Sequence, residues 1–111
     1  MSDKTVVIIS TAEAEKAQTG MMYAVNALKK GWMGDVKLII FGPAEELLLT
    51  DSVMQDFLRQ YQEEKKDVVA CKFIADRDST TAKIETLGIK VEFVGEMISN
   101  LVKEGYVPMV W

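Results

Sequence analysis

The sequence predicts an α/β domain built as a three-layer α/β/α sandwich, with helices on both faces of a mostly parallel five-stranded sheet. Short runs rich in β-branched residues alternate with longer segments of helical periodicity along the chain. The first such run, 6–9, is apolar at every position, which is typical of a strand buried on both faces. Strands that alternate with helices are joined by crossover connections, and such connections produce parallel sheets.

The whole chain, 1–111, is expected to form a single domain. Its 111 residues suit one domain and are too few for two. About 49% of the residues are apolar, so the chain can bury a hydrophobic core of its own. The sequence contains no repeat or low-complexity linker that would divide it.

The first strand is expected to lead directly into a helix. Ser10 and Glu13 have the spacing of a capping box, in which each side chain bonds to the backbone amide of the other residue. Gly31 is expected to end this helix, because glycine readily adopts the left-handed conformation found after helix ends. The apolar stripe between them has helical spacing: Ala14, Ala17, Met21, Ala24 or Val25, and Leu28.

A second buried strand is expected at 36–41. Gly42 and Pro43 close this strand, and proline suits the first turn of the short helix that follows. Either Asp51 or Ser52 can cap the next helix, whose apolar residues repeat at helical intervals and make it strongly amphipathic.

The second half of the chain is expected to add three strands. The third begins at Val68 and ends at Cys71 or Ile74, and a helix that stops at Gly88 follows it. The fourth strand is expected at 89–94. A short amphipathic helix then leads into a fifth strand near the end of the chain. That strand contains a proline without an amide hydrogen, so it is expected at an edge of the sheet.

The charge balance argues against a nucleic-acid partner. Seventeen acidic and thirteen basic residues give a net charge of −4, whereas phosphate contacts need clustered lysine and arginine. The tight basic pairs, Lys29-Lys30 and Lys65-Lys66, lie where helices are expected to end, and there cations complement the negative helix terminus.

The sequence also predicts a cytoplasmic protein without a membrane partner. No stretch approaches the roughly 20 apolar residues that span a bilayer. The apolar run near the N-terminus is shorter than the core of a signal peptide. A lone cysteine cannot form an internal disulfide, which fits a reducing compartment.

The absence of histidine narrows the chemistry that this chain can perform alone. It excludes Ser-His-Asp and Cys-His catalysis and imidazole metal sites, so neither a metal nor a cofactor is expected. In parallel sheets, ligands bind beyond the carboxyl ends of the strands. The residues expected to line a pocket there are Ser10, Thr11, Gly42 and Gly95.

Cys71 lies at this same edge and is the candidate catalytic residue. A thiolate is the reactive form of cysteine, and nearby cations and a helix N-terminus favour it. Lys72, Arg77 and a helix expected to start near Asp78 could supply both. Asp76 and Asp78 would offset the positive charge. In the alternative interpretation the cysteine is structural, because free cysteines are among the most buried residues and behave as small hydrophobes.

Four segments carry a resemblance to a known family. They are the opening strand KTVVIIS, the block GWMGDVKLIIFGPAEELL, the cysteine-containing DVVACKF, and the closing LGIKVEFVGEMISNLVKEGY. In pattern and order they resemble the DsrE/DsrF-like family, which includes YchN-like and TusD-like proteins. The resemblance implies a three-layer α/β/α domain, commonly assembled as trimers or hexamers, and a role in sulfur relay.

The resemblance also implies a role for the cysteine. In active members, a cysteine in the position of Cys71 accepts sulfane sulfur as a persulfide and hands it to a partner, so sulfur donor and acceptor proteins are implied. Those members follow the cysteine with small residues and then an Arg-Gly pair. This chain has KFI and then DRD there, with Arg77 as the approximate counterpart and no glycine.

Three functions therefore stay open: one that resembles a sulfurtransferase, one that is a non-enzymatic binding subunit, and one in which the chain is a purely structural member of an oligomeric ring. A persulfide carrier needs one accessible nucleophilic thiolate and no triad, which suits a chain with one cysteine and no histidine. The alternative is a non-catalytic subunit of an oligomeric assembly, whose pocket at the strand ends holds a small ligand or a partner peptide. Seven methionines and two tryptophans favour self-association in every case.

Overall fold

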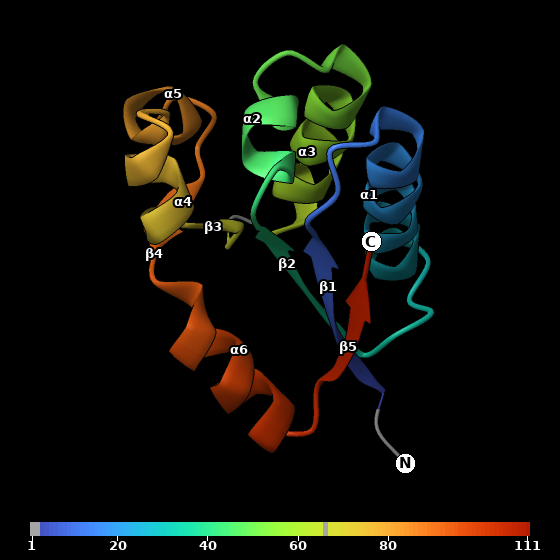
Figure 1. Ribbon diagram of the computed structural model, residues 1–111. Coiled ribbons are helices and arrows are strands. Elements are labelled where there is room, and N and C mark those ends of the chain that lie inside the picture. The colour runs from blue at the N-terminus through green and yellow to red at the C-terminus, as the bar shows by residue number, and fades with distance from the viewer. Residues whose placement is uncertain (1–2, 66) are drawn as a thin grey trace.

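The structure is a computed structural model that describes residues 3–65 and 67–111. Strands and helices alternate along these residues (Figure 1). The strands are β1 (Lys4–Ile9), β2 (Asp35–Ile40), β3 (Val69–Cys71), β4 (Lys90–Glu92) and β5 (Val107–Val110). The helices are α1 (Ala14–Lys29), α2 (Ala44–Leu48), α3 (Ser52–Glu64), α4 (Lys72–Arg77), α5 (Thr81–Glu85) and α6 (Val94–Lys103).

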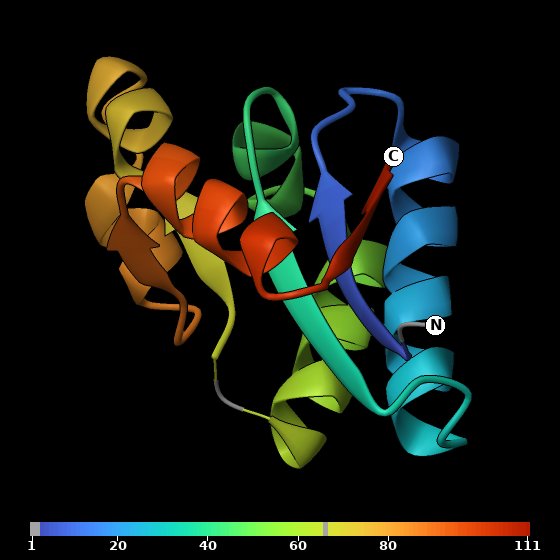
Figure 2. The same ribbon diagram turned by 90° about the horizontal axis from the view of Figure 1, so that it is seen from below.

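The strands form one parallel sheet in the order β4-β3-β2-β1-β5. The first three crossovers step in one direction across the sheet, whereas the connection from β4 to β5 returns to the far side of β1. Because such crossovers are right-handed, the direction of the step decides which face the helix covers. Helices α1 and α3 accordingly lie on one face and α6 on the other (Figure 2). The predicted three-layer fold is confirmed.

Two hydrophobic cores lie on the two faces of the sheet. The larger core packs the sheet against α1 and α3 and buries Tyr61, whose hydroxyl donates a hydrogen bond to the Val36 carbonyl at 2.9 Å. The smaller core, called the minor core below, lies between the sheet and α6. Its buried members are Val6, Ile8, Ile39, Val69, Cys71 and Val94.

Helix α6 crosses the second face alone and leaves part of it open. The strands that it connects lie four strand spacings apart, which is about 19 Å. A helix of 10 residues is about 15 Å long and about 10 Å wide, so it cannot cover a five-stranded sheet. Val110 on β5, for example, stays 64% exposed.

Several sequence predictions about caps and edges are confirmed. The strand that contains Pro108 lies at an edge of the sheet. Asp51 caps α3, because its carboxylate accepts a hydrogen bond from the Met54 amide at 2.8 Å. The glycines predicted to close the first helix, the second strand and the helix of α5 adopt positive φ: Gly31, Gly42 and Gly88. Gly105 after α6 does the same.

The predicted capping box at the start of α1 is wrong. Glu13 is the N-cap and makes no side-chain cap, while its amide donates to the Thr11 hydroxyl at 3.0 Å. The Ser10 hydroxyl instead lies 3.4 Å from the main-chain oxygen of Trp111. Pairing of β5 with β1 brings Trp111 to this turn, so a tertiary contact replaces the local cap.

The strands of the second half are shorter than the sequence suggested. β3 ends at Cys71, the nearer of its two predicted limits, and α4 follows at once. Asp78 is the C-cap of α4, and the helix expected to start near it starts at Thr81. The predicted strand at 89–94 is limited to β4, and α6 begins at Val94. Val94 is buried in the minor core there, so packing overrides its preference for a strand.

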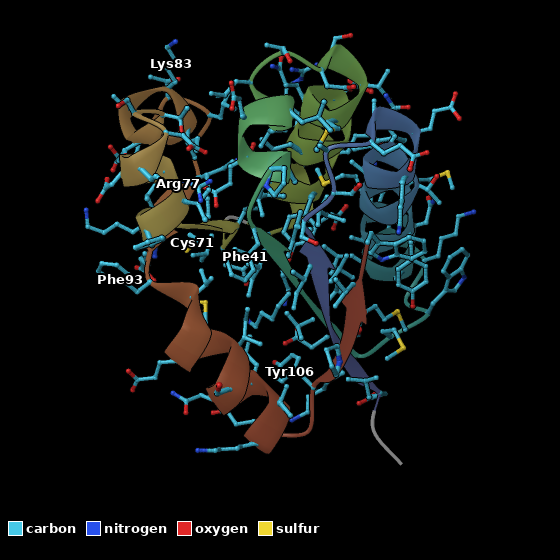
Figure 3. The ribbon with its side chains drawn as sticks, in the orientation of Figure 1. Phe41, Cys71, Arg77, Lys83, Phe93 and Tyr106 are labelled. Atoms are coloured by element: carbon cyan, nitrogen blue, oxygen red, sulfur yellow. The ribbon has the colours of Figure 1, made fainter. Side chains whose placement is uncertain are left out.

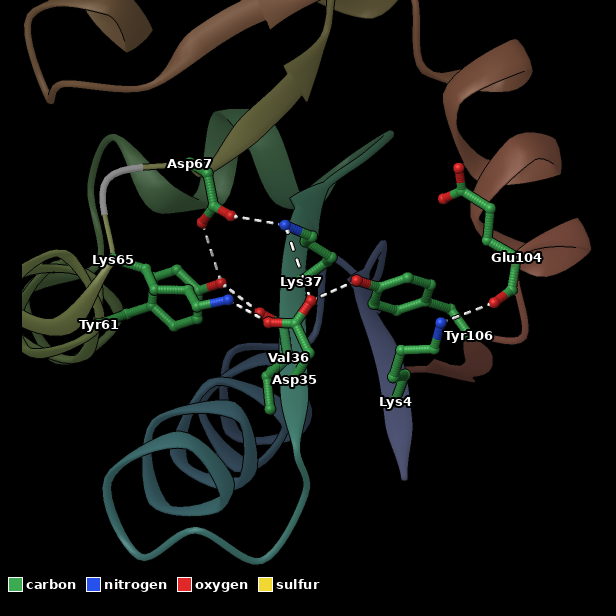
Figure 4. Close-up of polar contacts among 9 residues, drawn as sticks. All are labelled: Lys4, Asp35, Val36, Lys37, Tyr61, Lys65, Asp67, Glu104 and Tyr106. Atoms are coloured by element: carbon green, nitrogen blue, oxygen red, sulfur yellow. Dashed lines mark hydrogen bonds and ion pairs between the residues drawn. The ribbon is translucent and has the colours of Figure 1, made fainter. Parts of the chain in front are cut away.

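Asp35 is the centre of a polar network at the amino edge of the sheet (Figure 4). Its carboxylate accepts hydrogen bonds from Lys65 and Tyr106, and Lys37 Nζ lies 3.8 Å from it and 3.1 Å from Asp67. Burial raises the pKa of Asp35, but these donors outweigh burial and hold its pKa below the usual value. The network thereby ties the residues after α3 and before β5 to β2.

The described residues of the two basic pairs lie at helix ends. Lys29 ends α1 and Lys30 is its C-cap. Lys65 is the C-cap of α3, and Lys66 lies outside the described residues. Within those residues no helix is long and apolar enough to cross a membrane.

Candidate functional site

Cys71 is the last residue of β3 and directly precedes α4 (Figure 3). Its side chain is 6% exposed and packs in the minor core under α6. Cys71 stands opposite Glu92 of β4, and Val69 stands opposite Lys90. Because alternate residues of a strand share a face, these four side chains lie on the face that α6 crosses.

The two predicted activators of the thiol are held by aspartates. Lys72 Nζ lies 2.7 Å from the Asp76 carboxylate and 6.0 Å from the centre of the Phe93 ring. Arg77 Nε donates to the Asp78 carboxylate at 3.0 Å. Each cation is therefore largely neutralised beside the strand end.

The four residues predicted to line a pocket lie in different surroundings. The amides of Ser10 and Thr11 both donate to the main-chain oxygen of Trp111, at 2.7 and 3.1 Å, so they serve the docking of β5. Gly42 turns the chain after β2 with a φ of +59°. Gly95, expected in a loop, belongs to the first turn of α6, and a Cβ added there would meet open space.

Glu45 is the residue at this edge that the sequence analysis missed. It is 0% exposed, and neither carboxylate oxygen has a hydrogen bond of standard geometry within the described chain. The backbone groups of Cys71 and Gly42 face this carboxyl group. A buried carboxyl group without a hydrogen bond of standard geometry is costly, and such groups are found preferentially at functional sites. The position of Glu45 in the sequence was the clue to its role, because Glu45 follows the turn that closes β2.

The surroundings of Glu45 change its acidity. Burial raises the pKa of Glu45 to about 7. The backbone of Cys71 opposes this rise, Asp78 adds to it, and the Gly42 backbone and Arg77 oppose it. At neutral pH this group therefore exchanges between acid and carboxylate, so it can accept or donate a proton next to the end of β3.

A cavity of about 230 Å³ lies beneath α6, on the sheet face to which Cys71 belongs. Ile39 and Val69 contribute from the sheet, and Met97 and Leu101 contribute from α6. Charged residues also line it: Lys37, Asp67, Lys90 and Glu92. No group of three histidine, cysteine, aspartate or glutamate residues that could hold a metal ion occurs in 3–65 or 67–111.

Comparison with known proteins relates this chain to two solved structures. No protein-family model and no curated protein matches the sequence. The Bacteroides thetaiotaomicron protein BT1422, a conserved protein of unknown function, superposes with a TM-score of 0.88 at 22% identity, covering 98% of this chain and 95% of that one. The ychN protein from E. coli superposes with a TM-score of 0.77 at 13% identity, covering 97% and 99%. The predicted resemblance is therefore confirmed at the level of the fold.

Proposed function

We propose that this chain is a sulfur-relay protein that accepts sulfane sulfur on Cys71 as a persulfide and passes it to a partner protein. The observation that carries the proposal is the place of Cys71 in a fold shared with ychN. The thiol ends a strand at the carboxyl edge of the sheet, where parallel α/β folds bind their ligands. Sulfur donor and acceptor proteins are the partners that this role requires.

The chemistry requires one nucleophile. The Cys71 thiolate attacks the outer sulfur of a donor persulfide, and the S–S bond of the donor breaks. The donor leaves as a thiolate, and Cys71 becomes a persulfide. The later transfer to an acceptor thiolate repeats the same exchange in reverse. Neither a triad nor a metal takes part.

Access to the thiol depends on the start of α6. Val94 packs in the same minor core as Cys71, and Phe93 before it is 65% exposed. Helix ends open more readily than helix interiors, so fraying of this turn gives a donor its path to the sulfur. Glu45 supports the role as a positioning residue, because its carboxyl group faces the backbone of Cys71 and exchanges a proton near neutral pH.

The test compares native and denatured protein. The folded chain is incubated with a persulfide donor, and intact mass is measured with Cys71→Ser as the control. A gain of one sulfur atom by the wild type alone is expected. Native alkylation of Cys71 by iodoacetamide is expected to proceed without denaturant. Reaction only after unfolding would refute the relay.

A second function is favoured by a specific observation. Both Lys72 and Arg77 are paired with aspartates, and the thiol is buried, as suits a non-catalytic subunit that binds a small ligand or a partner peptide. If the chain is such a subunit, Cys71→Ser leaves the binding of the ligand or peptide unchanged. Loss of this binding in Cys71→Ser would count against the second function.

Either function is proposed to operate in a homo-oligomer, a trimer or a hexamer. Phe73 and Phe93 are 63% and 65% exposed, and Val107 and Val110 are exposed along the edge strand. Such apolar surface is typical of association sites. Light scattering on a size-exclusion column tests this proposal, and a clean monomer at micromolar concentration would contradict it.

A further inference from the structure

We propose that the cavity beneath α6 binds the persulfide of a small zwitterionic thiol, of the amino-acid type, and presents its outer sulfur to Cys71. This inference rests on the proposed relay and names the chemical class of a donor. Three observations carry it: the position of the cavity along the strands, the charges at its rim, and its size.

The cavity lies one residue pair from the thiol. Val69 and Lys90 form a pair that lines the cavity, and in the next pair on the same face Glu92 also lines it, opposite Cys71. Alternate residues of a strand lie about 6.6 Å apart. A small ligand held beside Val69 and Lys90 can therefore extend its sulfur along the strands toward Cys71.

The rim offers one free charge of each sign. Lys37 and Asp67 neutralise each other, with Nζ and Oδ2 3.1 Å apart. By contrast, the side chains of Lys90 and Glu92 form no ion pair with any other described residue. These two residues lie two positions apart on β4, so they share a face. A carboxylate suits the lysine and an ammonium group suits the glutamate, whereas a ligand with one charge would satisfy only one of them.

The size and the apolar surface limit the rest of the ligand. The volume of about 230 Å³ lies below the range of about 300–1,000 Å³ typical of pockets for drug-sized molecules. Ile39 and Val69 face Met97 and Leu101 across it. A short apolar arm that ends in sulfur fits these surroundings, since the thioether of methionine is itself soft and polarizable.

The transfer step balances without an added oxidant or reductant. The Cys71 thiolate attacks the outer sulfur of the bound persulfide, R–S–SH, and a new S–S bond forms as the old one breaks. The small thiol leaves as R–S⁻ and takes a proton from water. Cys71 holds the transferred sulfur as Cys71–S–SH.

Calorimetric titration of the full chain tests the site with L-cysteine as the probe, under reducing conditions. Cys71→Ser is titrated in parallel, which removes any reaction of the thiol. We expect saturable binding to both proteins. N-acetyl-L-cysteine lacks the ammonium group and cysteamine lacks the carboxylate, so each is expected to bind at least about tenfold more weakly. Equal binding of all three compounds, or no binding of L-cysteine, overturns the proposal.

Surface variants locate the binding site. Lys90→Ala and Glu92→Ala are each expected to weaken L-cysteine binding about tenfold or more. Both residues are exposed, so these changes leave the fold intact, which circular dichroism verifies. Lys83→Ala and Glu85→Ala on α5 are the matched controls and are expected to bind like the wild type. Unchanged binding in both cavity variants overturns the proposal.

The outcomes separate this inference from the relay itself. If Cys71 gains sulfur from a protein donor but L-cysteine does not bind, the relay stands and the cavity proposal fails. If L-cysteine binds and Cys71 never gains sulfur, the relay fails and the proposed presentation of sulfur to Cys71 fails with it.

Discussion

The carboxyl group of Glu45 faces the backbone of Cys71, buried from solvent and without a hydrogen bond of standard geometry. The two residues come from different units of the chain, one from the start of α2 and one from the end of β3. Their contact places a group that titrates near neutral pH against the backbone of the residue that carries the only thiol in the sequence. It makes the stability of this edge depend on pH.

Glu45→Gln is expected to remove a pH dependence of folding. Burial raises the pKa of Glu45 from 4.5 to about 7, so between these values the folded protein keeps a proton that the unfolded chain has lost. Stability therefore falls as pH rises through this window, by about 3 kcal/mol in all. Glutamine carries no charge, so the variant is expected to be flatter from pH 4.5 to 7 and more stable above it.

Denaturant unfolding at a series of pH values measures this difference. Glu46→Gln is the matched control, because Glu46 is the exposed neighbour in the same helix. The control is expected to follow the wild type. Parallel curves for the wild type and Glu45→Gln would show that Glu45 is not the titrating group.

Val94→Ala is expected to expose the thiol. Val94 is 1% exposed and packs in the minor core with Cys71, so truncation opens space at the start of α6. We expect faster alkylation of Cys71 in the native protein and a loss of about 2 kcal/mol of stability. Val102→Ala removes the same atoms from an exposed position on α6 and should change neither quantity. An unchanged alkylation rate in Val94→Ala would mean that the start of α6 does not limit access.

Asp35→Asn is expected to loosen the amino edge of the sheet. The change weakens the charged hydrogen bonds from Lys65 and Tyr106, at a cost of about 1.5–3 kcal/mol at neutral pH. Because the pKa of Asp35 is held below 3.8, its stabilisation is present above that value and is lost as pH falls through the lowered pKa. Asp56→Asn removes an exposed pair with Arg59 and should cost less than about 1 kcal/mol. If urea unfolding showed the same loss of unfolding free energy in Asp35→Asn and Asp56→Asn, the Asp35 network would not have the proposed stabilising role.

Gly20→Ala is expected to destabilise the protein although alanine favours helices. A Cβ at Gly20 would lie 2.5 Å from the Ile9 side chain and 2.5 Å from the Trp111 ring, so the packing of α1 on the sheet must shift. Overpacking of this kind costs about 1–3 kcal/mol. Gly95→Ala is the control, because nothing lies within 4 Å of the added atom. In thermal unfolding we expect Tm to fall for Gly20→Ala and to hold or rise for Gly95→Ala. A lower Tm for Gly95→Ala than for Gly20→Ala would contradict the close packing at Gly20.

The strands and most helix ends could be predicted because they depend on local chemistry. The apolar run of β1 is buried on both faces, and Asp51 caps α3 through an amide three residues away. The capping box at Ser10 failed because a residue 101 positions away provides the partner. The length of β4 was overestimated because Val94 begins α6 instead, and its burial in the minor core depends on how α6 packs on the whole sheet.

The candidate site could be predicted only in part. Parallel α/β folds bind their ligands beyond the carboxyl ends of the strands, and this rule led to Cys71. The lysine and arginine near it were predicted as activators, but their side chains are bound to aspartates whose geometry is set by the turns of α4. Glu45 resembles any surface glutamate in the sequence, since burial cannot be recognised from residue type.

By itself the sequence determined that this protein is an α/β domain with a parallel sheet, an edge strand that contains Pro108, and one thiol at the end of a strand. Periodicity, caps and the missing amide of proline act over a few residues, so they can be followed along the chain. Only the tertiary structure decided the strand order, the return of α6 across the second face, the cavity beneath it and the contact of Glu45 with Cys71. Each of these depends on which distant segments share the buried space.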